Sequence, residues 1–173
     1  MKLKISFILL ALFISRFEII ANRDSLSVHN IRKQTVDLFN NEVGILVFAS
    51  GYACKNCFEE LNIAILSLNQ NKIFDDIGVL INCKDNIIAK REAIDYYSKF
   101  FPKYNYYFDS TYVDVFNKKV DVGFWGEYEV SITPSLLIYK NRKIRFISYD
   151  EMFGNAATKV DLQKLILNTL SQM

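Results

Sequence analysis

Hydrophobic and polar positions fall into blocks along the chain, and the lengths of these blocks predict alternating strands and helices. Val43–Ala49 and Val79–Asn82 are short, continuous apolar runs of the kind that form strands buried on both faces. Between them, Cys57–Leu68 is long enough and apolar enough for a helix that packs on a sheet. The three segments therefore predict a strand, a covering helix and a second strand.

The regions on either side extend this order. Apolar or small residues around Asn30 to Phe39 predict a short helix before the first strand. After the second strand, Asp85 is expected to cap a helix over Asn86–Phe100, and Tyr104–Phe108 is expected to form a further strand. Asp114–Val120 is expected to be another short helix.

The end of the chain predicts a hairpin and a helix. Ser135–Tyr139 and Lys143–Ser148 are extended runs separated by a short turn, as in an antiparallel hairpin. Thr158, with Asp161 three residues later, has the spacing of a helix-capping pair. Strands that alternate with helices and end in a hairpin and a helix predict an α/β fold, with a mixed central sheet and helices on both faces.

Composition and charge narrow the class of protein. The chain has 173 residues, of which 51% are hydrophobic, enough to bury one full core. Its net charge of +2, without a basic tract, argues against a nucleic-acid partner. Because the chain has a single histidine, a His-based triad or a histidine-rich metal site cannot be built. We expect no bound cofactor and no resident metal.

The first residues have the pattern of an export signal. Lys2 and Lys4 flank the start of a mostly apolar run, Ile5–Ile14, which is too short to cross a bilayer because that takes roughly 20 residues. Residues 1–21 are therefore expected to be a signal peptide, and residues 22–173 the folded domain. An uncleaved anchor or a buried first helix is the alternative. We expect an exported, periplasmic or otherwise extracytoplasmic protein, with membrane contact only through this segment if it is uncleaved.

Two cysteines spaced Cys-x-x-Cys carry the clearest chemistry. Cys54 and Cys57 stand where the first predicted strand gives way to a helix, at the positive end of the helix dipole. A thiolate is stabilised there, and the neighbouring Lys55 adds a positive charge, so the pair favours dithiol–disulfide exchange. Soft cysteine pairs also bind Cu(I) or zinc, which leaves a thiolate metal carrier as a less favoured interpretation. Cys83 is either a small buried residue or a third redox thiol.

A second motif, Ile132-Thr133-Pro134, stands directly before the hairpin. An X-Pro bond at this place indicates a fixed bend, for which the cis form is one option. A buried strand, a Cys-x-x-Cys helix and a hydrophobic-Thr-Pro tripeptide before a hairpin and a last helix resemble the thioredoxin fold. This resemblance implies that Pro134 is cis and packs against the disulfide, while Thr133 presents backbone groups to a substrate.

The spacing of the two motifs is similar to that of one branch of this superfamily. Cys57 and Pro134 lie farther apart than in a plain thioredoxin, and the predicted Asn86–Phe100 helix and Tyr104–Phe108 strand fill the interval. Such an insertion resembles the exported TlpA-like thiol-disulfide oxidoreductases, over about residues 42–172. The resemblance implies that protein thiols or disulfides and an upstream thiol redox partner are the partners. It also implies that Glu60 is a candidate proton acceptor, although a glutamate in a first helical turn is equally expected as a solvated dipole partner.

Three features depart from the pattern of this family. Phe48 stands where an Asp or Asn is common, Ala53 replaces an aromatic residue, and the dipeptide between the cysteines is Lys55-Asn56 without a proline. These departures keep open a catalytically idle thioredoxin-like module that binds a partner through the groove at Pro134. The favoured function is that of an enzyme, in which Cys54 attacks and Cys57 resolves.

Overall fold

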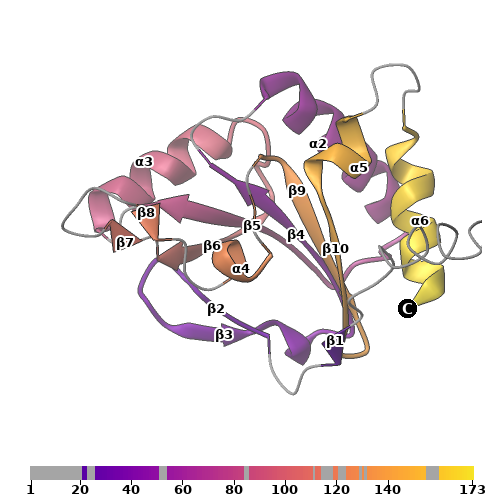
Figure 1. The fold of residues 1–173 in the computed structure, drawn as a ribbon, viewed down its shortest axis with the longest axis horizontal. Helices are drawn as coiled ribbons and strands as arrows, with labels where there is room; N and C mark the ends of the chain where they lie inside the picture. The colour runs from indigo at the N-terminus through magenta and orange to yellow at the C-terminus, as the bar shows by residue number, and fades with distance from the viewer. Residues whose placement is uncertain are drawn as a thin grey trace, which may run out of the picture.

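The computed structural model describes residues 21–22, 26–50, 54–83, 86–110, 112–113, 119–120, 124–128, 130, 132–154 and 160–173. Within these residues, no helix is both long and apolar enough to cross a membrane. The strands form an eight-stranded sheet in the order β1-β10-β9-β4-β5-β6-β2-β3, and helices pack against it (Figure 1).

The predicted strand–helix–strand unit forms the centre of the sheet. Strand β4 spans Val43–Ala49, helix α2 spans Lys55–Asn69 and strand β5 spans Asp76–Cys83. The two strands run parallel, with Gly44 opposite Asp76 and Ala49 opposite Ile81. Their carboxyl ends therefore lie at the same edge of the sheet, from which the chain enters α2. This confirms the first prediction.

The remaining sheet neighbours follow the predicted order. Helix α3, Ile87–Tyr97, leads to strand β6, Asn105–Ser110, which pairs parallel to β5. On the other side of β4 lies the hairpin of β9, Ser135–Lys140, and β10, Lys143–Ile147, with β9 antiparallel to β4. Its two turn residues have positive φ angles of 50° and 66°, as a tight primed hairpin turn requires. The inserted helix and strand and the hairpin are thus confirmed.

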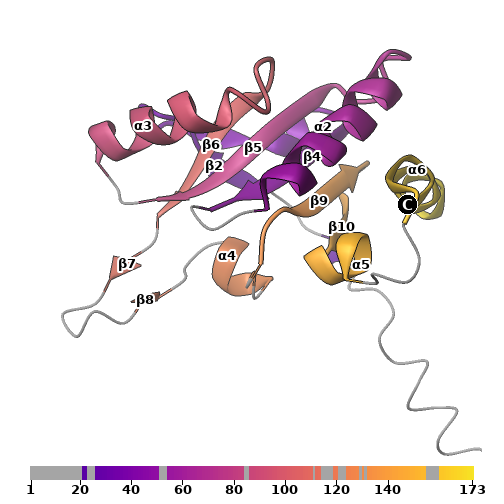
Figure 2. The same cartoon turned by 90° about the horizontal axis from the view of Figure 1, so that it is seen from above.

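Both faces of the central strands are buried, as their continuous apolar sequences predict. In β4, Ile45 and Val47 belong to the larger core with α2 and α6 (Leu162–Gln172), whereas Leu46 and Phe48 point to the opposite face. The opposite face is covered by α4, Phe124–Glu127, and by the N-terminal strands. Figure 2 shows α2 and α3 on one side of the sheet and α4 on the other. The mixed α/β fold is confirmed.

The helix predicted over Asn30 to Phe39 is wrong. The chain instead forms a small hairpin of β2, Ser27–His29, and β3, Thr35–Asp37, followed by the 3₁₀ turn η1, Leu38–Asn40. The side chain of Asn30 accepts hydrogen bonds from the backbone N–H groups of two later residues in the loop, Arg32 and Gln34. Such an Asx turn competes with helix formation, and it closes the hairpin instead.

The ends of two predicted helices are capped by other residues than expected. Asn86 caps α3 by accepting a hydrogen bond from the backbone N–H of Ala89 at 2.8 Å, while the expected cap, Asp85, lies outside the described residues. Asp161, and not Thr158, caps α6 by accepting from the N–H of Lys164 at 3.1 Å. Thr158 also lies outside the described residues.

Three short elements complete the described chain. Strand β7, Tyr112–Val113, pairs with β8, Lys119–Val120, so the end of the predicted Asp114–Val120 helix is extended; residues 114–118 lie outside the described part. Strand β1, Ala21–Asn22, pairs with β10. Helix α5, Tyr149–Phe153, directly follows β10. Since β10 is antiparallel to β9, α5 begins at the sheet edge where β9 starts.

Candidate redox site

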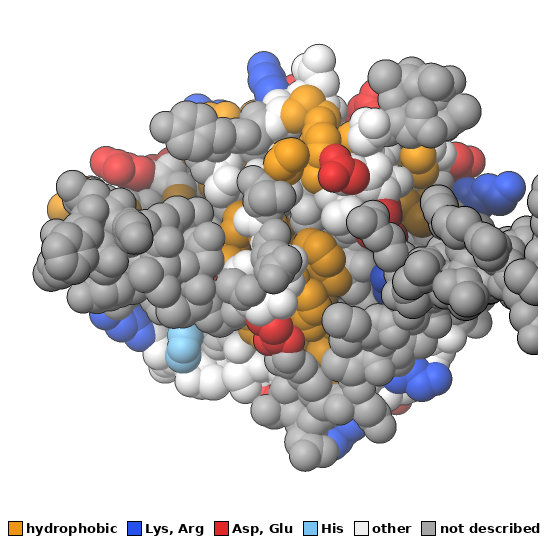
Figure 3. Space-filling model, in the orientation of Figure 1, with side chains coloured by type: hydrophobic (Ala, Val, Ile, Leu, Met, Phe, Trp, Pro, Cys, Tyr) orange, Lys and Arg blue, Asp and Glu red, His pale blue; other side chains and the backbone are white. Residues whose placement is uncertain are grey.

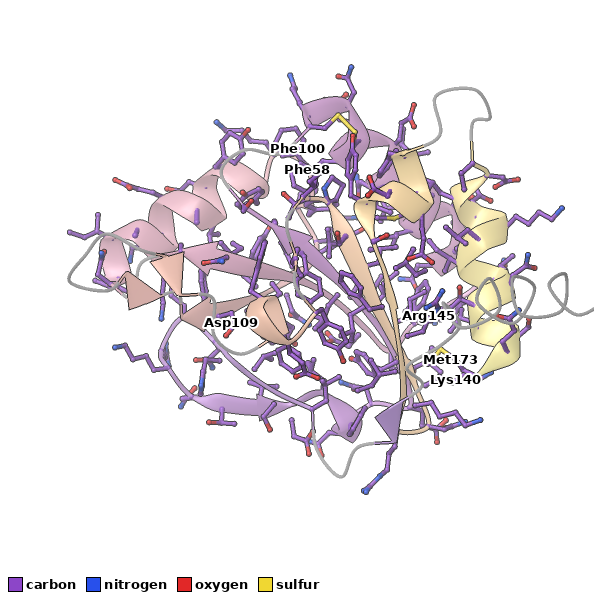
Figure 4. The ribbon with its side chains drawn as sticks, viewed as in Figure 1. Phe58, Phe100, Asp109, Lys140, Arg145 and Met173 are labelled. Atoms are coloured by element: carbon purple, nitrogen blue, oxygen red, sulfur yellow. A yellow bond between two sulfur atoms is a disulfide. The ribbon has the colours of Figure 1, made fainter. Side chains whose placement is uncertain are left out.

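Cys54 and Cys57 form a disulfide at the start of α2. Their Cα atoms lie 5.2 Å apart, and Cys54 is the residue that caps the helix. Figure 4 shows the disulfide at the N-terminal end of α2, close to α5. The predicted cysteine pair is therefore joined, at the carboxyl edge of β4.

The two sulfur-bearing residues differ in their access to solvent. Cys54 is exposed, whereas Cys57 retains only 8% of its surface and is counted among the core residues. An incoming sulfur can therefore reach Cys54 more easily than Cys57. This asymmetry is what a disulfide-exchange motif needs, because one sulfur must be attacked and the other protected.

A hydrogen-bond donor at the helix terminus contacts the exposed cysteine. The backbone N–H of Cys57 donates to Sγ of Cys54 at 3.3 Å. A thiolate formed on Cys54 therefore faces the N–H groups and the positive end of the helix dipole, which stabilise negative charge. Lys55 lies 4.0 Å from Glu59 in an exposed ion pair, so its charge acts on Cys54 through solvent.

The Thr133-Pro134 bond is cis, and it lies at the same edge of the sheet. Ser135 pairs with Phe48 at the end of β4, and the hydroxyl groups of Thr133 and Ser50 share a hydrogen bond of 3.3 Å. Because Ser50 stands just before the cysteine loop, this contact links the proline turn to the segment that carries the disulfide. Thr133 and Pro134 are both buried.

Part of the surface around this edge is apolar. Ile132, which precedes the cis bond, exposes 47% of its surface. In Figure 3, hydrophobic atoms gather on the displayed face around the beginning of α2 and the neighbouring part of α5. A small pocket of about 180 Å³ is lined by Ile132 and Ser135 on one side and by Ser148 and Tyr149 on the other. An exposed apolar side chain and a small pocket therefore lie next to the cis-proline turn.

Two residues of the site were not predicted from the sequence. Ser50 meets Thr133, and the phenolic oxygen of Tyr149 lies 3.6 Å from Sγ of Cys57. Tyr149 is 92 positions away from Cys57 in the chain. One signal was available in the sequence: Tyr149 follows the last predicted strand. That strand runs antiparallel to the strand that begins after Pro134, so its end lies at the edge of the sheet where the Pro134 strand begins.

Glu60 lies apart from this cluster, on the exposed side of α2. It lines an open groove of about 630 Å³ with Ile63 of the same helix and with Val160 and Asp161 at the start of α6. Its role as a proton acceptor stays a prediction.

Phe48, one of the departures from the family pattern, lies in the core beside Trp125. Trp125 is 2% exposed and packs edge-on against Phe48 at 5.5 Å, so it belongs to the core and not to a groove. Phe48 itself is fully buried and also contacts Phe146. A carboxylate at this position would lose these contacts. Ala53, the second departure, lies outside the described residues.

Cys83, the third thiol, lies on β5, and the described residues also bear on the alternative of a bound metal ion. Cys83 ends β5, is half-buried and packs against the larger core. Burial raises the pKa of Tyr97, and smaller contributions come from Tyr96 and Cys83, which places Cys83 near α3. Among the described residues, no three His, Cys, Asp or Glu side chains cluster in a way that could hold a metal ion.

Sequence comparison matches no protein-family model and no curated protein. The fold, in contrast, is similar to that of a secreted disulfide oxidoreductase of Mycobacterium tuberculosis that is homologous to E. coli DsbE. The TM-score is 0.51 at 13% identity, over 85% of this chain and 96% of the other. The thioredoxin domain of a thiol-disulfide oxidoreductase from Bacteroides vulgatus gives 0.54 at 12% identity, over 89% and 98%. A domain of a possible thiol-disulfide isomerase from Cytophaga hutchinsonii gives 0.54 at 15%, over 90% and 93%.

These similarities extend over most of the chain. At such low identities they establish the fold. The chain has a thioredoxin-like fold, with a Cys-x-x-Cys disulfide at the N-terminal end of α2.

Proposed function

We propose that this protein is a thiol-disulfide oxidoreductase that exchanges disulfides with other proteins through Cys54 and Cys57. The observation that carries the proposal is the unequal burial of the two cysteines at a helix N-terminus: Cys54 is exposed and Cys57 is 8% exposed. A purely structural disulfide needs neither an accessible sulfur nor a site that stabilises a thiolate.

The proposed reaction has two exchange steps. In the reductive direction, the Cys54 thiolate attacks a substrate disulfide, forms a mixed disulfide and releases one substrate thiolate, which takes a proton from water. Cys57 then loses its proton and attacks Sγ of Cys54. The second substrate thiolate leaves, and Cys54 and Cys57 become joined. Two electrons pass from the cysteine pair to the substrate, and the reverse sequence oxidises a dithiol.

The surrounding residues receive supporting roles in this proposal. Pro134 is proposed to pack beside the disulfide and to shape the groove, and the backbone of Thr133 is proposed to pair with an extended substrate. The exposed Ile132 adds apolar contact next to them. Glu60 is proposed to accept a proton from the cysteine pair through solvent, because it is exposed one helical turn after Cys57.

The compartment and the partners belong to the same proposal. The apolar run that follows Lys2 and Lys4 supports export, with residues 1–21 as a cleaved signal or an uncleaved anchor. An oxidising compartment supplies protein thiols and disulfides as substrates, and an upstream thiol partner resets the cysteine pair. The secreted M. tuberculosis oxidoreductase with a similar fold supports this compartment.

The test traps the mixed disulfide. In a Cys57→Ser variant the resolving thiol is missing, so substrates are expected to stay bound to Cys54 and to be released by dithiothreitol. The matched control, Cys54→Ser, is expected to trap nothing, since Cys57 is buried. A Cys83→Ser change in both variants removes the third thiol from the comparison.

Two outcomes would overturn the proposal. One is a Cys57→Ser protein that captures no partner, combined with iodoacetamide labelling of Cys54 no faster than that of an ordinary cysteine. The other is equal trapping by both variants. The first would favour the partner-binding module, which keeps the groove and needs no thiolate.

A further inference from the structure

We propose that Tyr149 is a catalytic residue whose phenolic hydroxyl donates a hydrogen bond to the sulfur of Cys57 and stabilises it as a thiolate during exchange. This inference rests on the proposed function, and it assigns to the site a residue outside both sequence motifs. Its basis is the contact of 3.6 Å between Oη of Tyr149 and Sγ of Cys57.

The contact matters for the chemistry because the Cys57 sulfur is buried. Cys57 is 8% exposed, so little water reaches its sulfur. When Cys57 carries a negative charge, that charge must be stabilised by groups of the protein. Burial in apolar surroundings alone would disfavour the thiolate, whereas a hydroxyl that donates to it favours the charged form.

Tyr149 is held in place by its own helix. It is the first residue of α5, whose cap, Ser148, forms a reciprocal capping box with Glu151. Glu151 is also joined to Arg145 of β10 by an ion pair of 2.9 Å. The ring of Tyr149 packs against Phe153 at 5.3 Å between centroids. The hydroxyl is therefore oriented by a helix start that is fixed at several points.

The same hydrogen bond serves both directions of the reaction. In resolution, Cys57 gives up its proton through solvent to Glu60, the acceptor named in the proposed function, and its thiolate attacks Sγ of Cys54, so the bond between Cys54 and the substrate sulfur breaks. In the reverse step, a substrate thiolate attacks Cys54 and Cys57 leaves with the electron pair. Tyr149 keeps its own proton throughout. Because a hydrogen bond to an ionised acceptor is stronger than one to a neutral acceptor, the donor acts mainly when Cys57 is charged.

A two-phase thiol assay separates this role from that of Cys54. Reduced protein in a Cys83→Ser background is mixed with an equimolar amount of dithiobis(nitrobenzoate), and nitrothiobenzoate release is followed by stopped flow at neutral pH. The first phase reports attack by Cys54. The second reports attack by Cys57 on the mixed disulfide.

The test compares Tyr149→Phe with Tyr96→Phe, which removes the hydroxyl of an exposed tyrosine on α3. Tyr149→Phe is expected to slow the second phase roughly tenfold, the effect of about 1.4 kcal/mol at the step where Cys57 is charged. The first phase and the unfolding midpoint of the oxidised protein are expected to stay unchanged. Tyr96→Phe is expected to leave both phases unchanged.

The inference is overturned if Tyr149→Phe leaves the second phase at the wild-type rate, or if both phases slow by the same factor, as a general structural defect would cause. These outcomes leave the proposed function intact when the wild-type protein still shows two phases. A wild-type protein with a first phase no faster than that of an ordinary thiol would instead overturn both.

Discussion

Removing the hydroxyl of Tyr139 should destabilise the protein without affecting its cysteines. Tyr139 lies on β9 and donates a hydrogen bond of 3.0 Å to the carboxylate of Asp76, which is 4% exposed. The same carboxylate accepts from Asn105 at 2.6 Å and from the hydroxyl of Tyr107 at 3.3 Å. Buried carboxylates depend on such donors, since burial removes their hydration.

The size of the effect follows from the geometry of these bonds. A hydrogen bond to a charged group contributes about 1.5–3 kcal/mol, so Tyr139→Phe should cost about 2 kcal/mol. For a domain of this size that corresponds to a midpoint lowered by about 4–8 °C. Tyr107→Phe should cost about 1 kcal/mol, because its two contacts with Asp76, at 3.3 and 3.4 Å, are longer than an ideal O–H···O bond.

Urea unfolding of the oxidised proteins at pH 7 measures these differences, with Tyr96→Phe as the control for loss of an exposed hydroxyl. Asp76 opens β5, at the edge of the sheet opposite the disulfide. The rate of Cys54 alkylation in the reduced proteins should therefore match the wild type.

The reasoning fails if Tyr139→Phe costs less than about 0.5 kcal/mol, the range of ordinary surface changes, or if Tyr107→Phe costs more than Tyr139→Phe. Either result would mean that hydrogen-bond length does not predict how much each tyrosine that donates to the Asp76 carboxylate contributes to stability.

Three further predictions follow from other contacts. Gly44→Ala should cost more than Tyr139→Phe in the same unfolding assay, because a Cβ at Gly44 would overlap the ring of Tyr139; an equal or smaller cost would contradict this. The contribution of Tyr106 to the free energy of unfolding should be complete below about pH 10 and fall as the pH rises above it. Burial raises the pKa of Tyr106 to about 12, whereas a tyrosine of the unfolded chain ionises near pH 10. Urea unfolding between pH 8 and pH 11 checks this. Tyr106→Phe should make the decline shallower but not remove it, because burial also raises the pKa values of Tyr97, Tyr104, Tyr107 and Tyr139. Lys55→Gln should change the free energy of unfolding by less than about 0.5 kcal/mol, because the ion pair of Lys55 with Glu59 is exposed. At low salt, the same change should slow iodoacetamide labelling of Cys54. An unchanged labelling rate would show that Lys55 does not stabilise the Cys54 thiolate.

The central elements were predictable because their sequences are unambiguous. Val43–Ala49 is apolar at every position except a glycine, and the structure buries it on both faces. The hairpin followed from its turn residues, whereas the proline before it left the cis form as one option and only the resemblance implied it. The hairpin at residues 27–37 was missed because its strands are three residues long, too short for a period of two to show, while Ile31, Thr35, Leu38 and Phe39 have helical spacing.

The candidate site was predictable only where a motif marks it. Cys54, Cys57, Thr133 and Pro134 carry a local signature, and the structure brings their segments to one edge of the sheet. Tyr149 and Ser50 carry none: their contacts arise from strand register, which brings the end of β10 and the start of β9 beside the end of β4. No local propensity encodes such a contact.

The reduction potential of the Cys54–Cys57 pair tests the central claim most directly. The protein is equilibrated in glutathione redox buffers, and the fraction of disulfide is measured by alkylation and mass spectrometry. A redox-active pair with an exposed, helix-stabilised sulfur predicts a two-electron transition between about −270 and −120 mV, the range of exchange proteins. A pair that stays oxidised below about −300 mV would behave as a structural disulfide and would contradict the account.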